Sequence, residues 1–272
     1  MFESLSNFIM RARYLLTSRD NLLKKQIGSH VMYLDLKDSG VSATLMRMKP
    51  GSPDREAAFM KVLRQELKQG MTAIDIGANI GYVTLIMAEL VGPSGKVYAF
   101  EPNPNSFRVL VKNIQANGYT DFVFPYQMGI SNTNGVLNFY VSDKWNLSGM
   151  SATKHSKQVI DIPVTTLDDF MKDKGCPDFI KMDIEGHEVE ALAGMHQTLK
   201  NADRPVKILI EVHQIYYSEN HSLEKELRKL IEIGFNTKYV ISAGVARPDF
   251  FAEHGYEPVE VFYTGGSYRG IY

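Results

Sequence analysis

Short apolar runs alternate with longer amphipathic stretches from residue 71 onward. The first run, Thr72–Ile76, precedes a helical pattern that continues to about Val91. A second run, Val97–Phe100, precedes a helical pattern from Pro104 to Asn117. Apolar strands that alternate with helices are typical of a parallel sheet packed between helices. We therefore expect an α/β fold.

The remaining elements follow the same pattern with one interruption. Residues 135–166 break the alternation and are predicted to form an inserted β-hairpin around a polar loop. The other predicted elements are strands at Phe122–Gln127, Phe179–Met182 and Val206–Val212, hairpin strands at Val136–Val141 and Val159–Thr165, a helix at Ser222–Ile233, and strands near Thr237–Ser242 and Val259–Thr264.

The N-terminal part has a different pattern. Residues 1–27 show apolar positions at helical spacing with mostly basic side chains between them, which predicts an amphipathic helix. We interpret it as a helix that packs on its own domain or in a dimer, and docking to a membrane surface is the alternative. Strands are expected at Val31–Leu36 and Ala43–Met48, before a helix that Asp54 caps and Gly70 ends.

The composition disfavours several classes of protein. The chain has 272 residues, with 30 Lys and Arg against 31 Asp and Glu, so a formal net charge of −1 gives no basic excess for nucleic acid. Cys176 is the one cysteine, so neither an internal disulfide nor a cysteine metal cluster can form. No apolar run of about 18 residues predicts a membrane span, and the first residues lack a signal-peptide pattern. We therefore expect a cytoplasmic protein.

A glycine-containing turn after the first predicted strand carries the clearest signal of a ligand site. The strand ends in Asp75, and Gly77 and Gly81 flank the turn into the next helix. Small residues such as Ala78 let a ligand approach the backbone, and the helix N-terminus offers free N–H groups. The spacing differs from the G-x-G-x-x-G of dinucleotide sites. A carboxylate here would repel a pyrophosphate but suits a cationic ammonium group, as in S-adenosylmethionine.

An acidic residue at the end of the next strand completes the pattern. Glu101 follows Gly81 by 20 residues. An acidic side chain in this position accepts hydrogen bonds from the two hydroxyls of a ribose. Alone, Glu101 would be interpreted as a strand-end residue before a proline turn. Together with the glycine loop, it favours a nucleoside-binding site.

Several motifs, taken in order, resemble the FkbM-type methyltransferases. They are Asp75–Gly81, Phe100–Asn103, Thr166–Asp169, Phe179–Glu188 and Ile210–His213, and the similarity spans about residues 30–240. The resemblance implies a class I methyltransferase fold, a Rossmann-like sheet with helices on both faces, here with an inserted β-hairpin and a helical and β-stranded N-terminal extension. It implies S-adenosylmethionine as methyl donor and O-methylation, often of sugar or polyketide hydroxyls. We expect the extension over residues 1–53 and the methyltransferase domain over residues 54–272.

The resemblance also implies which residues contact the cofactor. Asn79 replaces a glycine found in this loop of most methyltransferases, and an Asn is typical of the FkbM-type family. Its side chain could contact the methionine carboxylate or cap the helix. Gly129 follows the third strand, where an adenine ring commonly lies. The set expected to bind the cofactor is Asp75, Gly77, Ala78, Asn79, Gly81, Tyr82, Glu101, Pro102, Asn103, Met128, Gly129 and Asp183.

Four side chains near two strand ends are predicted to be catalytic: Asp183, Glu185, Glu211 and His213. Methyl transfer is an in-line displacement, and a hydroxyl is a poor nucleophile at neutral pH without a base or a metal. His213 at a strand tip is the candidate general base. Binding of a divalent metal by Asp183, Glu211 and His213 is the alternative to catalysis without a metal.

Three further features have their own interpretations. Lys181 faces the same side of its strand as Asp183 and is expected to fix it through a salt bridge. Glu188 lies in the first turn of a predicted helix, where it is expected to interact with the helix dipole. The loop Trp145–Ser151 carries an aromatic ring and polar side chains suited to a sugar, so we expect it to cap the acceptor.

The leading hypothesis is an S-adenosylmethionine-dependent O-methyltransferase acting on a sugar or glycosylated small molecule. The alternatives that stay open are an acceptor nitrogen, lipid or protein, and a non-catalytic nucleoside-binding subunit. The loop spacing disfavours a nicotinamide oxidoreductase, and the lack of a basic, aromatic-rich stretch disfavours nucleic acid as the acceptor. A homo-oligomer also stays open.

Overall fold

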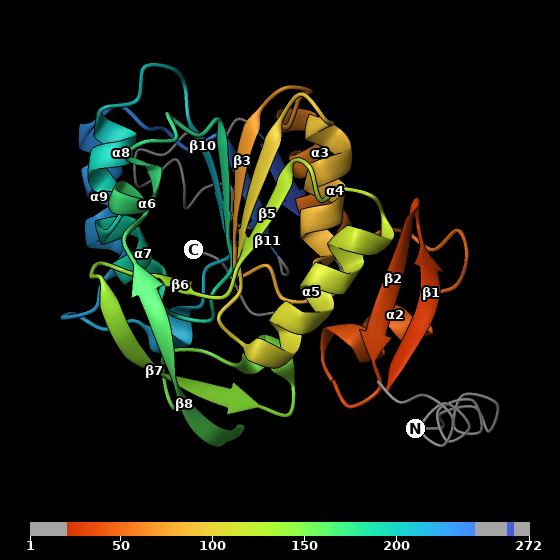
Figure 1. Cartoon of the computed structure of the whole chain (residues 1–272). Coiled ribbons are helices and arrows are strands. Elements are labelled where there is room, and N and C mark those ends of the chain that lie inside the picture. Colours follow the sequence, from red (N-terminus) through yellow and green to blue (C-terminus); the bar gives the residue numbers. More distant parts are fainter. Residues whose placement is uncertain (1–20, 243–259, 264–272) are drawn as a thin grey trace.

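The computed structural model describes residues 21–242 and 260–263, and its centre is a parallel five-stranded sheet (Figure 1). Every neighbouring pair in this sheet is parallel. The strands predicted from the apolar runs are confirmed to within a few residues. Their spatial order is β10 (Lys207–Ile210), β9 (Phe179–Met182), β3 (Thr72–Ile76), β4 (Lys96–Phe100) and β5 (Val123–Tyr126).

Helices cover both faces of the central sheet (Figure 1). Two clusters of buried hydrophobic side chains fill the space between the sheet and its helices. The predicted α/β class with Rossmann-like layering is confirmed. One face carries α3 (Ala57–Glu66), α4 (Tyr82–Val91) and α5 (Pro104–Ala116), and the other carries α6 (Leu167–Met171), α7 (Glu188–Ala193), α8 (His196–Lys200) and α9 (Leu223–Glu232).

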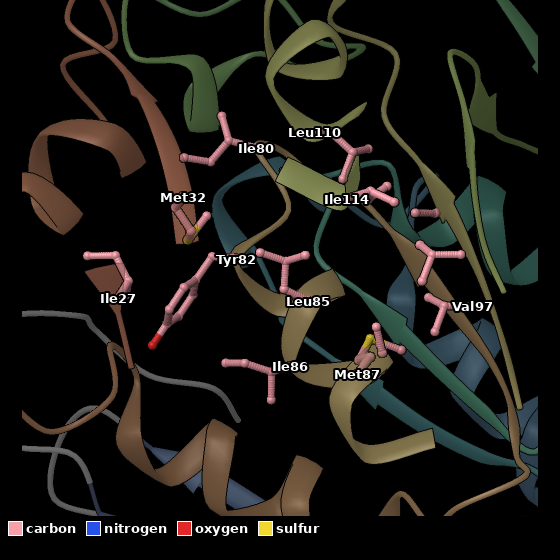
Figure 2. Close-up of a cluster of buried hydrophobic side chains, with 14 of the residues drawn as sticks. Ile27, Met32, Ile80, Tyr82, Leu85, Ile86, Met87, Val97, Leu110 and Ile114 are labelled. Carbon is pink, nitrogen blue, oxygen red and sulfur yellow. The ribbon is translucent and has the colours of Figure 1, made fainter. Parts of the chain in front are cut away.

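The larger hydrophobic cluster surrounds α4 (Figure 2). This helix buries most of its residues, including Tyr82, Leu85 and Ile86. Ile27 and Met32, from the N-terminal segment, belong to the same cluster. Each buried side chain of this size stabilises the fold by about 1.5–3 kcal/mol. The N-terminal segment is therefore packed into the core rather than attached to its surface.

The N-terminal extension differs from its predicted form. Residues 1–20 lie outside the described residues, but Leu22–Ile27 forms a strand, β1, rather than the end of a helix. It pairs antiparallel with β2 (His30–Asp35) through a connection of Gly28 and Ser29. Gly28 has a φ of +56°, the left-handed conformation that two-residue hairpin turns require. The helix prediction is wrong for these residues. The leucines have helical spacing, but Gly28 forms a turn that pairs this segment with β2 as a strand.

A second correction concerns the predicted strand at Ala43–Met48, which lies mostly in a short helix, α2 (Val41–Arg47). A nearby carboxylate stabilises the first end of this helix, and a lysine distant in sequence stabilises the other. Asp38 accepts a hydrogen bond from the backbone N–H of Ser42 at 2.7 Å. At the other end, Lys25 Nζ donates to three carbonyls at 2.6–3.0 Å, where a cation also interacts favourably with the helix dipole.

Helix α3 begins later than predicted. Asp54 does not cap it, because the residue before the helix is Glu56, whose backbone is left-handed with a φ of 56°. The helix ends at Glu66, so Gly70 lies in a later turn. The Asp54 carboxylate instead accepts from the hydroxyl of Tyr82 at 3.3 Å. This contact holds the segment before α3 against the start of α4.

Two asparagines on α5 tie the N-terminal hairpin to the sheet domain. Asn113 accepts from the backbone N–H of Tyr33 at 2.6 Å and donates to its carbonyl at 3.2 Å. Asn117 does the same for Val31, at 3.0 and 2.8 Å. These side chains take the place of a neighbouring strand along β2 and satisfy its backbone groups.

The predicted insertion is confirmed as a β-hairpin. β7 (Gly135–Ser142) pairs antiparallel with β8 (Ser156–Thr165), and the short β6 (Gly129–Ile130) joins β8 in parallel. This three-stranded sheet is separate from the central sheet (Figure 1). The loop between β7 and β8 contains a short 3-10 helix, η1 (Trp145–Leu147).

Two strands near the C-terminus are also found where the sequence predicts them. β11 (Tyr239–Ser242) and β12 (Glu260–Tyr263) pair with each other in parallel. Among residues 21–242 and 260–263, no helix combines the length and the apolar character needed to cross a membrane.

A charged cluster joins α3 to β10 and β11. The Glu66 carboxylate lies 2.7 Å from Lys207 Nζ and 2.6 Å from Lys238 Nζ, and it accepts from the hydroxyl of Tyr239. Burial raises the pKa of Glu66, but these hydrogen bonds outweigh it and lower the pKa to about 2. The folded state therefore binds the ionised form of Glu66 more strongly than the unfolded chain does.

We expect Glu66→Gln to destabilise the protein by about 1 kcal/mol at neutral pH, because charge-assisted hydrogen bonds to partly exposed lysines are lost. The folded-state pKa lies below the unfolded value, so this stabilisation is present above about pH 4.5 and disappears as the pH falls toward about 2. Denaturant unfolding at about pH 7 and about pH 3 measures the difference.

Glu224→Gln is the matched control, because Glu224 pairs with Arg228 on the exposed face of α9. It should change the free energy of unfolding by less than about 0.5 kcal/mol at either pH. A Glu66→Gln effect of the same size at both pH values would contradict the role of the ionised carboxylate.

Candidate active site

A cavity of about 1150 Å³ opens at the carboxyl ends of β3, β4, β9 and β10. Ligands of open parallel sheets bind at this edge. Most of the residues predicted from the sequence line this one cavity: Gly77, Ala78, Asn79, Tyr82, Glu101, Pro102, Met128, Gly129, Asp183, Glu185, Glu211 and His213. Asp75, Gly81 and Asn103 are not among the lining residues.

The glycine loop brings two strand tips into direct contact. Gly77 has a φ of +83°, and a Cβ there would lie 1.9 Å from the carbonyl oxygen of Asp183. Only glycine fits this approach of β3 and β9. Gly81 has a φ of +92° and packs against the side chain of Leu110, so it serves helix packing rather than the cavity. Gly77 is therefore required by the contact between the ends of β3 and β9, and Gly81 by packing against Leu110.

Glu101 is held rigidly at the tip of β4. Its carboxylate accepts from the backbone N–H groups of Asn79 at 2.7 Å and Asn103 at 2.8 Å, one on each oxygen. Burial raises the pKa of Glu101 to about 7 in spite of these donors. Asn103 itself caps α5 by accepting from the backbone N–H of Asn105 at 3.0 Å. Both oxygens of Glu101 can each accept a further hydrogen bond.

Asp75 lies behind the cavity wall. It is fully buried, and its carboxylate lies 3.0 Å from Lys181 Nζ and accepts from the hydroxyl of Thr84 at 2.6 Å. Asp75 and Lys181 are directly paired in the β3–β9 register, so the predicted Lys181–Asp183 bridge is wrong in its partner. Burial lowers the pKa of Lys181, but the charge of Asp75 outweighs burial, and the pKa of Lys181 is raised. The expected contact of Asp75 with the cofactor stays a prediction.

Lys181 also holds the glycine loop that follows β3. Its Nζ donates to the carbonyl of Gly77 at 2.7 Å. A buried ammonium group thus connects the carboxylate of β3 to the loop that follows the same strand. The loop conformation is fixed by this charge pair as well as by its glycines.

The four predicted catalytic side chains converge on one side of the cavity. His213 Nε2 lies 3.7 Å from Asp183 Oδ1 and 3.6 Å from Glu185 Oε2. Asp183, Glu211 and His213 each offer one ligand atom, and these atoms all lie within 4.8 Å of one another. The geometry can hold a divalent cation or transfer a proton.

The crowding of acidic groups changes their protonation. The negative charge of Asp183, followed by burial, raises the pKa of Glu211 to about 8. Burial is the main cause that raises the pKa of Glu185 to about 7. Burial opposes the charge on His213, but the hydrogen bond with Glu188 and the nearby carboxylates raise its pKa to about 9. The cluster therefore holds protons, or another cation, at neutral pH.

Some residues in or beside the cavity have positions or contacts that the sequence did not predict. Glu188 lies in the first turn of α7 as predicted, but its buried carboxylate lies 2.9 Å from His213 Nδ1. Arg55 and Glu56, from the segment before α3, also line the cavity. Glu188 follows β9 in the sequence and His213 follows β10. Because these two strands are neighbours in the sheet, the order of the strands could have indicated that the two side chains meet.

The loop of the inserted hairpin forms another wall. Trp145, Asn146 and Ser148 line the cavity. The Trp145 backbone N–H donates to Asp38 at 3.3 Å, and Asn103 Nδ2 donates to Ser148 Oγ at 3.4 Å. The loop expected to cap the acceptor is thus brought to the same cavity, and its role there stays a prediction.

Comparison with known proteins gives a family match. A family model described as the methyltransferase FkbM domain matches residues 75–257. The hexuronic acid methyltransferase AglP of Haloferax volcanii is 29% identical over 161 residues, which cover 58% of this chain and 62% of that protein. The protein-L-isoaspartate O-methyltransferase 1 of Arabidopsis thaliana is 33% identical over 72 residues, or 26% of this chain and 31% of that protein. The chain thus matches less than two thirds of the length of each.

Among solved structures, an S-adenosylmethionine-dependent O-methyltransferase from Thermotoga maritima aligns with a TM-score of 0.42 and 15% identity. The alignment covers 78% of this chain and 70% of that chain.

Proposed function

The chain belongs to the FkbM methyltransferase family, and from that premise we propose that it transfers a methyl group from S-adenosylmethionine to a hydroxyl oxygen of a sugar or glycosylated small molecule. S-adenosylmethionine is its cofactor. One observation carries the proposal. A single cavity joins a buried strand-tip carboxylate, suited to a ribose, with an imidazole among carboxylates, suited to activating a hydroxyl.

The residues present fit the cofactor. Glu101 has one backbone donor on each carboxylate oxygen, which leaves each oxygen able to accept from one ribose hydroxyl. Gly77, Ala78 and Asn79 line the cavity next to the start of α4, where backbone N–H groups at a helix N-terminus can bind a ligand. When bound, S-adenosylmethionine supplies an electrophilic methyl group on a positively charged sulfur. We assign Gly77, Ala78, Asn79, Glu101 and Pro102 to its binding.

His213 is the proposed general base. The raised pKa of about 9 makes the ring deprotonated at Nε2 the minor form at neutral pH, and in that form His213 would accept the proton of the acceptor hydroxyl as the methyl group is transferred. Asp183 and Glu185 lie within 3.7 Å of that nitrogen and stabilise the imidazolium that forms.

The chemistry of the cavity favours a neutral hydroxyl over a carboxylate at the reacting position. Asp183, Glu185 and Glu211 surround His213, and those of them that are ionised repel an anionic nucleophile. Trp145, which is buried in the larger hydrophobic cluster, and Asn146 of the hairpin loop border the cavity, and the Asn146 amide is a polar group suited to a sugar. AglP, a relative, is a hexuronic acid methyltransferase, which supports a sugar acceptor. An acceptor nitrogen, lipid or protein, or a non-catalytic role, would be the alternative.

The acceptor class is tested with two matched sugars, p-nitrophenyl glucuronide and p-nitrophenyl glucoside, and S-adenosylmethionine with a radioactive methyl group. We expect labelled product that survives mild base, because a methyl ether resists the hydrolysis that cleaves a methyl ester. Base-labile product from the glucuronide alone would replace the hydroxyl with a carboxylate acceptor. Binding of S-adenosylhomocysteine without transfer to either probe would move the search to the other acceptor classes.

Two variants should separate cofactor binding from chemistry. Glu101→Ala removes two charge-assisted hydrogen bonds to the ribose, so S-adenosylhomocysteine should bind at least tenfold more weakly by calorimetry. His213→Ala should bind it within about twofold of the unchanged protein while turnover falls about 100-fold. Normal affinity of Glu101→Ala for S-adenosylhomocysteine would contradict the proposed nucleoside site. Normal turnover of His213→Ala would show that the imidazole is not the general base.

A metal-assisted route is the second candidate, and the ligand geometry favours it. Asp183, Glu211 and His213 place three ligand atoms of the types that Mg²⁺ or Mn²⁺ accepts within 4.8 Å of one another. A cation there would neutralise the crowded carboxylates and bind two neighbouring hydroxyls of a sugar. The carboxylates would then no longer hold a proton on His213.

Removal and return of the metal test this route. If a cation is required, dialysis against a chelator should abolish turnover while S-adenosylhomocysteine still binds, and added Mg²⁺ or Mn²⁺ should restore turnover. Glu211→Gln should then need more metal for half-maximal activity. Full activity after chelation would leave proton transfer to His213 as the route.

A further inference from the structure

His213 is held from two sides by residues that do not line the cavity. Glu188 Oε1 lies 2.9 Å from its Nδ1. The hydroxyl of Tyr217 donates to Glu188 Oε2 at 2.7 Å, and it accepts from the backbone N–H of His213 at 3.2 Å. One carboxylate and one phenol therefore fix both the ring and the backbone of the same residue.

The Glu188 carboxylate is fully buried. Besides His213 and Tyr217, it accepts from the backbone N–H of Gly186 at 3.2 Å. Burial of a carboxylate is costly unless it is paired and hydrogen-bonded, and a well-packed apolar side chain is often as stable in such a place. A role in overall stability is therefore a weak explanation for an acid at this position.

The hydrogen bond determines which ring nitrogen of His213 faces the ligand. A carboxylate can only accept, so Nδ1 carries a proton. In the neutral imidazole, Nε2 is then the unprotonated nitrogen, and it is the atom that points toward Asp183 and Glu185. That nitrogen is able to accept a proton from a hydroxyl or to bind a cation.

A second carboxylate on the same helix offers a direct comparison. Glu190 lies 3.0 Å from His221 Nε2, and the other ring nitrogen of His221 lies 3.1 Å from the carbonyl of Tyr216. This pair holds His221, in the segment that follows β10, against α7. It does not contact His213. α7 thus anchors one segment twice, and only the Glu188 anchor contacts His213, whereas Glu190 lies 3.4 Å from Nδ1 of His187, another residue that lines the cavity.

We propose that Glu188 and Tyr217 are positioning residues that keep the proton on Nδ1 of His213 and direct Nε2 toward the cavity, so that Nε2 is the nitrogen that exchanges a proton or binds a cation. The inference rests on the proposed methyl transfer for its kinetic consequence, but the state of the ring itself does not depend on that function. It applies equally to His213 as base and to His213 as metal ligand, because both need the same free nitrogen.

The kinetic test compares Glu188→Gln with the matched variant Glu190→Gln, using whichever sugar probe is methylated. Glu188→Gln should lower kcat by about 10–100-fold while KM for S-adenosylmethionine and the affinity for S-adenosylhomocysteine stay within about twofold. Glu190→Gln should keep kcat within about threefold. Equal losses in both variants would assign Glu188 to anchoring of the segment and overturn the proposal.

A spectroscopic test needs no acceptor. Nitrogen NMR of protein labelled with ¹⁵N in histidine reports which ring nitrogen carries the proton, and the His213 signals are those missing from His213→Gln. At alkaline pH, where the ring is neutral, we expect one form, protonated on Nδ1, in the unchanged protein. We expect a mixture of the two forms in Glu188→Gln. An unchanged His213 spectrum in Glu188→Gln would overturn the proposal even if the methyl acceptor is unknown.

Tyr217→Phe keeps the test informative if Glu188→Gln does not fold. It removes one hydroxyl and leaves the carboxylate in place, so kcat should fall less than in Glu188→Gln, and the proton on Nδ1 should be retained. Loss of cofactor binding in this variant would contradict a positioning role. If the unchanged protein binds S-adenosylhomocysteine and methylates neither sugar, the proposed function fails while the nitrogen spectrum still decides the inference.

Discussion

The cavity depends on a buried ion pair between the tips of two adjacent strands. Lys181 and Asp75 face each other across β3 and β9, both almost without exposure to solvent. Removing one partner of such a pair leaves an uncompensated buried charge, which typically costs about 3–5 kcal/mol. The pair also reaches the loop, because Lys181 donates to the carbonyl of Gly77. The position of the glycine loop therefore depends on a charge pair that a ligand does not need to contact.

The same edge of the sheet concentrates negative charge beyond that pair. Lys181 is already committed to Asp75, so it compensates the outer carboxylates of Asp183 and Glu211 only from a distance. The charge of Asp183 raises the pKa of Glu211, and the hydrogen bond with Glu188 together with the charges of Asp183 and Glu185 raises the pKa of His213. An edge of this kind is suited to a positively charged ligand, and S-adenosylmethionine brings a positive charge to this edge in our proposal. The electrostatics of the cavity and the chemistry of the cofactor agree.

The sequence predicts what local patterns determine. Phe179–Met182 is recovered to the residue because a buried parallel strand is a continuous apolar run. It does not predict what distant residues determine. The end of the helix over Ala43 and Leu45 is stabilised by Lys25, 20 residues before Leu45, and a local window of sequence does not show that contact. The site shows the same limit: the tips that carry Glu101 and His213 were predicted, but the partners of Lys181 and Glu188 come from neighbouring elements.

The N-terminal extension contacts the loop between β7 and β8, which lines the cavity. Asp38 accepts from the backbone N–H of Trp145, and Asn103, two residues after Glu101, donates to Ser148 of the same loop. The loop is thus held between the extension and the tip of β4. The family match begins at residue 75 and does not include the extension. If this loop selects the acceptor, as we propose, selectivity depends on an element outside the matched domain, while the chemistry depends on strand tips within it.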